Sequence, residues 1–179
     1  VDKDALDSVR VQFEQEKQDI EKRLNKQVKE LMGDTPINLN SPEQMSWVIY
    51  SRKPIEKALW ANSFTPYMDN TDYKQTVATK STIVYKTKAE QCNPCSGTGY
   101  IRKVKKDGTP FARPTKCDAC DSVGYLFVPD KMVIGGLKFN APNAKWVSAN
   151  GFSVNKTNLG TLYTMAKHKN MTSAMNFLS

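Results

Sequence analysis

The four cysteines of this chain form two Cys-x-x-Cys pairs, Cys92 with Cys95 and Cys117 with Cys120. A Cys-x-x-Cys turn places two thiolates on one metal ion at about 2.3 Å, and two such turns complete a tetrahedral site. No coordination position then remains for water, so the site is expected to be structural. The sequence therefore predicts one structural zinc ion bound by all four cysteines.

The two pairs belong to a repeated unit. Residues 92–100 and 117–125 follow the same pattern of two cysteines, a small residue, a glycine and a tyrosine. Glycines just past the cysteines let backbone N–H groups turn toward the sulfurs without a clash at Cβ. Ser122 departs from the pattern, because the first unit has Gly97 at the equivalent place.

Disulfide or redox chemistry is the alternative use of these thiols. Disulfides are rare in the cytosol, and a redox Cys-x-x-Cys normally occurs as one pair near a β–α–β pattern, which this sequence lacks. A redox protein would oxidise Cys92 with Cys95 reversibly and hold no stoichiometric metal. All four cysteines fall into the two pairs, so none is left as a nucleophile and we predict no catalytic residue.

The elements that must position the cysteines form a small β module. Runs of β-branched and aromatic residues, which are typical of strands, lie at 83–85, 100–104, 125–128 and 132–137. Asp107-Gly108 is a turn signal and predicts a hairpin that projects between the two cysteine pairs. Such a small module cannot bury enough apolar surface to fold alone, so its metal must stabilise it.

The projecting hairpin is strongly basic. Its residues include a single acid, Asp107, and six cations that we predict to contact DNA phosphates: Arg102, Lys103, Lys105, Lys106, Arg113 and Lys116. Tyr100, Phe111 and Tyr125 lie close by in the sequence and could stack on bases, but we expect them to pack within the module.

Helices are predicted on both sides of the β module. Apolar residues at steps of three, four or seven between 5 and 32 predict one long amphipathic helix that ends at Gly33. A second helix begins after Ser41, with Gln44 closing a capping box, and a further helical turn is expected at 55–60 before a loop at 63–72. After Gly151, helices return, the first capped by Thr157.

Charge and hydropathy narrow the function classes. The net charge of +8 is uneven: residues 1–34 hold 7 basic and 9 acidic residues, whereas residues 131–179 hold 6 lysines and no acid. This gradient indicates a polyanionic partner, most simply nucleic acid. No apolar run is long enough to span a bilayer and no signal peptide is evident, so we expect a cytosolic protein without a membrane partner. The chain ends within an apolar, helix-like stretch, which suggests a piece of a longer protein.

The repeated cysteine unit resembles the zinc domain of DnaJ-type chaperones over about 35 residues. Those chaperones usually carry four such repeats and a His-Pro-Asp signature, and this chain has two repeats and no such signature. The resemblance supports the metal rather than a chaperone. It leaves a second hypothesis, a stand-alone zinc module that binds extended peptides.

Residues 32–45 resemble the thumb of family A DNA polymerases in the phrase Asn38-Leu-Asn40-Ser41-Pro-Glu-Gln-Met45. In that family the phrase contacts the backbone of the primer-template duplex, which implies DNA contacts for Asn38, Asn40 and Ser41. Alternatively the asparagines only shape the loop and Ser41 only caps its helix. The preceding long helix and the segment from 150 are also similar to the thumb.

The resemblance implies an α+β chain of three parts: thumb helices at 1–52, an inserted zinc module at 53–149 with its zinc core near 85–135, and returning thumb helices at 150–179. Some phage polymerases carry thumb insertions, so a phage protein acting in the host cytoplasm is expected. Nothing matches the palm carboxylates or the fingers, so this chain alone should not polymerise or bind a small-molecule substrate. The zinc module would extend the contact with DNA or dock a replisome or processivity partner.

Overall fold

The computed structural model describes residues 2–64 and 70–179 and has the predicted α+β fold. The helices are α1 (Lys3–Met32), α2 (Pro42–Tyr50), α3 (Lys57–Trp60), α4 (Asn70–Lys80), α5 (Lys156–His168) and α6 (Thr172–Leu178). The strands are β1 (Arg52–Pro54), β2 (Ser81–Ile83), β3 (Tyr85–Gln91), β4 (Tyr100–Ile101), β5 (Thr115–Lys116), β6 (Tyr125–Ile134), β7 (Val147–Ser148) and β8 (Gly151–Phe152). They form antiparallel pairs β1–β2, β3–β6, β4–β5 and β7–β8.

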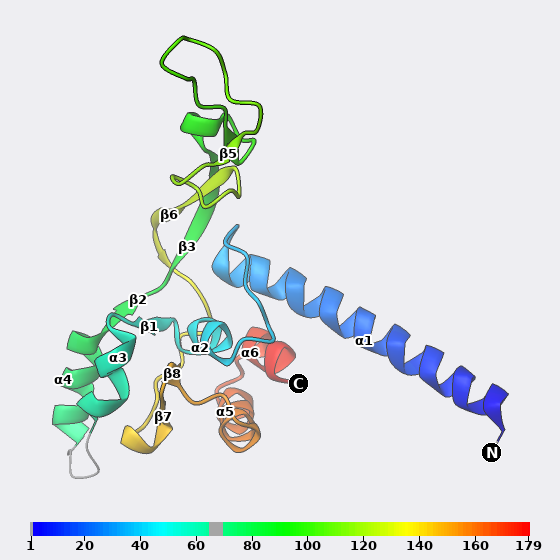
Figure 1. The fold of residues 1–179 in the computed structure, drawn as a ribbon. Coiled ribbons are helices and arrows are strands. Elements are labelled where there is room, and N and C mark those ends of the chain that lie inside the picture. The colour runs from blue at the N-terminus through cyan, green and yellow to red at the C-terminus, as the bar shows by residue number, and fades with distance from the viewer. Residues whose placement is uncertain (1, 65–69) are drawn as a thin grey trace.

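The molecule has a body, a projecting ribbon and a projecting helix (Figure 1). The body gathers α2 to α6 around β1, β2, β7 and β8, and the β3–β6 ribbon leads from it to the cysteine module. The chain between β4 and β5 forms the far tip of that projection. None of the helices described has the length and apolarity needed to cross a membrane.

The body has one hydrophobic core to which all three predicted segments contribute. Val48, Trp60 and Leu162 are almost fully buried, and they come from α2, α3 and α5. The rings of Trp60 and Phe152 meet edge to face at 5.3 Å between centroids, and the indole N–H of Trp60 donates to the Gly151 carbonyl at 3.0 Å. The first part of the predicted insertion is thus packed into the same core as the helices on either side of it.

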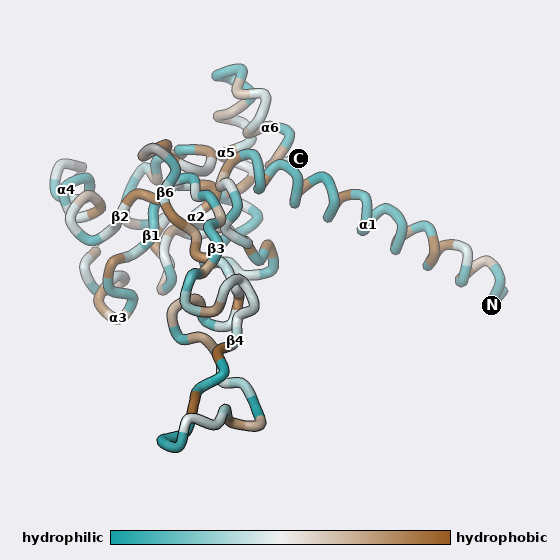
Figure 2. The backbone as a smooth tube through the Cα atoms, turned by 90° about the horizontal axis from the view of Figure 1, so that it is seen from above, coloured by the Kyte–Doolittle hydropathy of each residue, from teal (hydrophilic) through white to brown (hydrophobic). Residues whose placement is uncertain are grey.

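Helix α1 confirms the long amphipathic helix. The Asp2 side chain accepts from the Asp4 N–H at its start, and Gly33 ends it with a φ of 79°. Only its last turns are covered, by packing of Val28 and Met32 into the core. The apolar stripe continues outward as isolated brown segments along a largely teal helix (Figure 2), and its exposed members are Leu6, Val9, Phe13 and Ile20.

Two predicted caps differ in the structure. The Ser41 hydroxyl accepts from the Gln44 N–H as expected, but the Gln44 side chain accepts from the Asn38 N–H rather than closing a capping box. The Ser41 N–H instead donates to the Asn38 carbonyl, so it is already satisfied. Helix α5 is capped by Asn155, whose side chain accepts from the Asn158 N–H, because the helix begins one residue before Thr157.

The predicted loop at 63–72 is wrong at both ends, and its centre, residues 65–69, lies outside the described residues. Ser63 ends a 3-10 turn, and residues 70–72 already belong to α4. Helix α4 was missed because its sequence is polar and rich in β-branched residues, which are poor helix formers. Only the four-residue step from Tyr73 to Val77 marked its inward face.

The β3–β6 ribbon is rooted on the end of α1. Strand β6 is one strand where the sequence indicated two runs. A register shift between Tyr85 and Thr87 of β3 accommodates residues 130–133 of β6 within the ladder. The Asp34 N–H donates to the Thr87 carbonyl at 2.9 Å, and the Asp34 carboxylate accepts from the Ala89 N–H at 2.9 Å. These contacts hold the base of the ribbon beside the loop that carries Asn38 and Asn40.

Candidate metal centre

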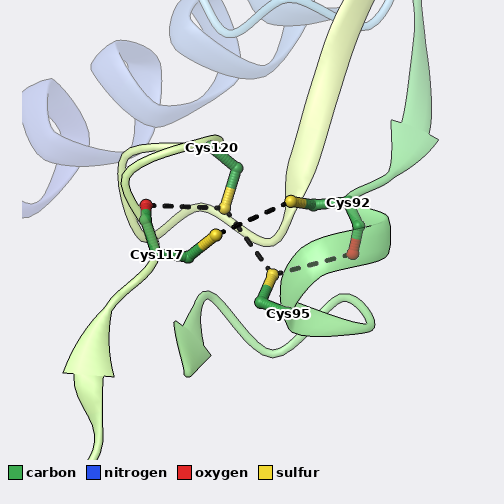
Figure 3. A group of neighbouring side chains, drawn as sticks. All are labelled: Cys92, Cys95, Cys117 and Cys120. Carbon is green, nitrogen blue, oxygen red and sulfur yellow. Dashed lines mark hydrogen bonds between the residues drawn. The ribbon is translucent and has the colours of Figure 1, made fainter. Parts of the chain in front are cut away.

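The four cysteine sulfurs converge at the end of the β3–β6 ribbon. Their Sγ atoms all lie within 4.8 Å of one another, and all four side chains are buried. Across the two pairs, Cys92 Sγ lies 3.8 Å from Cys117 Sγ and Cys95 Sγ lies 3.7 Å from Cys120 Sγ (Figure 3). A tetrahedron with metal–sulfur bonds of about 2.3 Å has edges of about 3.8 Å. The four buried cysteines are therefore arranged to hold one metal ion, as predicted.

These distances also bear on disulfide formation. A disulfide bond is about 2.05 Å long, so sulfurs at 3.7 to 3.8 Å are not bonded, and all four cysteines are free thiols in the structure. A closed set of four sulfurs matches the ligand type and number that structural zinc sites use.

Each Cys-x-x-Cys turn is built in the same way. In the first, the Gly99 N–H donates to Cys95 Sγ at 3.3 Å, and in the second the Gly124 N–H donates to Cys120 Sγ at 3.2 Å. The two turns are also joined reciprocally, since the Cys92 N–H donates to the Gly124 carbonyl and the Cys117 N–H to the Gly99 carbonyl, both at 2.9 Å. The sequence repeat is therefore a structural repeat with approximate two-fold symmetry.

Two glycines permit this close association. A Cβ on Gly99 would lie 2.2 Å from the Ser122 carbonyl oxygen, and a Cβ on Gly124 would lie 2.3 Å from the Gly97 carbonyl oxygen. Each of them thus lets the backbone of one turn touch the backbone of the other. Ser122 adopts a φ of 68° where Gly97 has 82°, so serine takes the left-handed conformation that its glycine counterpart adopts without cost.

The thiols have unequal proton affinities. Burial raises the pKa of the Cys92 thiol to about 12. At Cys95 the effect of burial is outweighed by the N–H of Gly99 and by the Cys92 and Cys120 side chains, and the pKa falls to about 7. The cluster thus favours the thiolate of Cys95, while burial raises the pKa values of Cys92 and Cys117, and a bound cation would favour ionisation of the set.

We expect metal affinity to rise with pH because protons must leave the thiols when the ion binds. Each proton released changes the apparent affinity by about tenfold per pH unit, and thiols in the metal-free chain are largely protonated across the neutral range, with an ordinary pKa of about 8.5. Competition with a chromophoric chelator between pH 6 and 8 measures the effect. An affinity that does not change with pH would show that the cysteines do not bind the metal as thiolates.

Apolar packing contributes little to the cysteine module. The core around the four cysteines includes only one further apolar residue, the partly buried Ile101. Larger side chains stay outside this core, among them Tyr100, Val104, Phe111, Val123, Tyr125 and Leu126. The expectation that Tyr100, Phe111 and Tyr125 pack within the module is therefore wrong, because the module has no apolar interior that could receive them.

The six basic residues predicted to contact DNA lie together on the projecting hairpin and are all exposed. The hairpin follows the predicted turn, with Tyr100 opposite Lys116 and a bridge between Val104 and Pro110. Asp107 is occupied within the turn, where its carboxylate accepts from the N–H and hydroxyl of Thr109, and these bonds lower its pKa. Among the described residues the salt bridges are Lys57–Glu43 and Lys88–Asp130, and neither involves a hairpin cation.

Asn38, Asn40 and Ser41 lie elsewhere, in the loop between α1 and α2 at the base of the ribbon. Asn38 and Asn40 are exposed, and Ser41 is half-buried. The Asn38 side chain accepts from the Asn40 N–H at 3.0 Å, so it shapes the loop as the alternative interpretation held, while Ser41 caps α2. The structure therefore places the predicted DNA-contact residues in two groups, at the base and at the tip of one projection.

A cavity that the sequence did not indicate lies between β1, α4 and the core. It measures about 290 Å³ and is lined by Tyr73, Val77, Phe139 and Phe152, with Arg52 at its polar side. The Tyr73 hydroxyl is buried without a hydrogen-bond partner among the described residues, and burial raises its pKa to about 12. The Arg52 side chain is held by the protein itself, through two hydrogen bonds to Ser81.

No family model, curated protein or solved structure matches this chain.

Proposed function

We propose that this chain is a DNA-binding thumb segment of a family A DNA polymerase, inactive by itself, with an inserted module that one structural zinc ion stabilises. Zinc is the ion whose ligand set and bond lengths suit four clustered thiolates. Cys92, Cys95, Cys117 and Cys120 would hold it, and its role is to fix the two turns from which the hairpin projects.

DNA binding rests on one observation, the six exposed hairpin cations that have no acidic partner among the described residues. A surface charge that is not compensated within the protein is free to replace the counterions of a phosphate backbone. The resemblance of residues 32–45 supports the class of parent protein, and the exposed amides of Asn38 and Asn40 suit phosphate or sugar contacts that do not read sequence.

The structure suggests how the two groups of residues could act on one duplex. The ribbon that carries the hairpin is hydrogen-bonded to Asp34 and Thr35, a few residues before Asn38. These hydrogen bonds fix the base of the ribbon next to the Asn38 loop. A duplex bound at that loop would therefore have the ribbon and its basic hairpin beside it. Lys86 and Lys88 belong to β3, which joins the two groups, and Lys88 is paired there with Asp130.

The test is the salt dependence of binding to a fluorescent primer-template hairpin, measured by anisotropy with the zinc-loaded chain. Each phosphate neutralised adds about 0.9 to the slope of log affinity against log salt, so we expect Lys105→Ala with Lys106→Ala to lower the slope by about 2. The control is Lys17→Ala with Lys22→Ala on α1, which removes the same charge from exposed positions in the acidic part of the chain.

The control variant should bind as the unchanged chain does. A zinc-loaded chain with no salt-dependent affinity for the primer-template at low ionic strength would overturn the proposal. Binding of extended peptides by the module, without any affinity for DNA, would instead support the alternative hypothesis of a stand-alone protein-interaction module.

A further inference from the structure

We infer that the zinc module binds single-stranded DNA, with the exposed rings of Tyr100 and Tyr125 as platforms on which bases stack. The inference rests on the proposed function, in which the chain binds DNA, and it specifies the form of DNA that the module takes. The starting observation is that the aromatic rings of Tyr100 and Tyr125 are exposed to solvent rather than buried in a core.

The two tyrosines are equivalent positions of the cysteine repeat. Each follows the glycine whose N–H donates to a cysteine sulfur, Gly99 in the first turn and Gly124 in the second. Tyr100 is 48% exposed and Tyr125 is 47% exposed, so the approximate two-fold symmetry extends to their solvent access. Neither belongs to the small core around the cysteines.

Rigid backbone holds both tyrosines in place. The carbonyls of Gly99 and Gly124 accept from the cysteine N–H groups of the opposite turn, so the residue before each tyrosine is fixed by the other half of the module. Tyr100 pairs with Lys116 in the β4–β5 ladder, and Tyr125 pairs with Gln91 in the β3–β6 ladder. Aromatic rings on such a support lose little further freedom when a base stacks on them.

Positive charge lies beside Tyr100 and Phe111. Tyr100 has Lys116 opposite it on the same ribbon, and Phe111, which is 47% exposed, has the Lys105 ammonium 5.9 Å from its ring centroid. Residues 100–116 carry six cations against one acid, and that acid is held in the turn by Thr109. Accessible aromatic rings among cations are what proteins use to hold single strands, in which the bases are free to stack.

Duplex DNA would contact the cations of the module but not its exposed aromatic rings. In a duplex the bases are already stacked on one another, so a protein without groove-reading elements contacts mainly phosphates. The cations alone would serve that purpose, and the exposed rings would then be placed in water without a partner. Single-stranded DNA engages both kinds of side chain, which is why we prefer it to the duplex as the ligand of the module.

The experiment compares fluorescein-labelled (dT)15 with a labelled duplex hairpin on the zinc-loaded chain. Stacking contributes about 5- to 150-fold in affinity per base, so Tyr100→Leu and Tyr125→Leu should each weaken (dT)15 binding by at least fivefold, while Tyr100→Phe and Tyr125→Phe should retain it. Leucine keeps apolar bulk and phenylalanine keeps the aromatic face, so the contrast isolates stacking from general hydrophobic contact. Zinc content and circular dichroism check that every variant is folded.

Duplex affinity should change by less than about twofold in all four variants, because phosphate contacts do not involve the rings. Equal (dT)15 affinity for the leucine and phenylalanine variants would overturn the inference. Salt-dependent binding of the duplex without binding of (dT)15 would overturn the inference and leave the proposed function standing. A zinc-loaded chain that binds neither (dT)15 nor the duplex would count against the proposed function itself. Tyrosine-dependent binding of an extended apolar peptide, with no binding of (dT)15, would assign the surface to a protein partner and likewise overturn it.

Discussion

Removal of the metal ion is expected to unfold the cysteine module, roughly residues 90–126, while α1 and the main core stay folded. The module's own core consists of four cysteines and Ile101, so little apolar burial would remain without the metal. A structural zinc site contributes roughly 10–16 kcal/mol of apparent binding free energy at neutral pH, which is more than a two-stranded ribbon can replace. Cys117→Ser should have the same effect, since Cys117 is fully buried.

Hydrogen exchange followed by mass spectrometry, with zinc and after chelation, measures this effect segment by segment. Protection should be lost in β4, β5 and the two cysteine turns and return when zinc is added back. Protection of β3 near Thr87 and Ala89 should persist, because Asp34 holds that part of the strand. The matched control is Asp118→Ser, an exposed neighbour of Cys117 that contributes no sulfur to the cluster.

Two results would contradict this account. Simultaneous loss of protection in the module and in α2 or α5 would show that the two parts fold as one unit. Unchanged protection after complete metal removal would show that the module does not depend on its ion.

Replacement of Trp60 by alanine is expected to destabilise the main core by about 3–5 kcal/mol. Trp60 is 1% exposed, and its ring contacts Phe64 and Phe152 edge to face, at 4.6 and 5.3 Å between centroids. The substitution also removes the indole N–H that donates to the buried Gly151 carbonyl, which the Ser148 hydroxyl shares as a second donor. Guanidinium denaturation followed by circular dichroism measures the change in the free energy of unfolding.

Trp60→Phe separates packing from hydrogen bonding at this site. Phenylalanine keeps most of the apolar contact and loses the donor to Gly151, so we expect a smaller loss, about 1–3 kcal/mol. A loss of less than about 1 kcal/mol for Trp60→Ala would mean that α3 is an independent appendage of the core. A loss of the expected size would show that α3 is part of the core that it shares with α2 and β8.

Helix α1 and the cysteine turns could be predicted because their causes are local. The steps of three and four between apolar residues describe α1, and Gly33 ends it by adopting a positive φ that other residues avoid. The Cys-x-x-Cys spacing and the following glycines describe each turn, since the N–H that donates to its second cysteine sulfur lies only four residues further along the chain. The hairpin between the pairs follows from Asp107-Gly108 in the same way.

The predictions were wrong where contacts with residues elsewhere in the fold, rather than the local sequence, selected the structure. Asn155 rather than Thr157 caps α5, because both are acceptable caps and only the path of the chain selects between them. Helix α4 has weak propensity and is held by burial of Tyr73 against Phe64, a contact that no local pattern records. The exposure of Tyr100 and Tyr125 also escaped prediction, because aromatic residues are usually buried when a core is available.

By itself the sequence determined the local units of this protein: the long helix, the two cysteine turns with their shared metal site, and the basic hairpin between them. Only the tertiary structure decided how those units are arranged. Contacts between residues far apart in the chain hold the ribbon to Asp34 and join α3 to the core through Trp60. Such contacts depend on how the surfaces of the elements fit together and on which hydrogen-bonding groups are still free. The spacing of residues along the chain indicates neither.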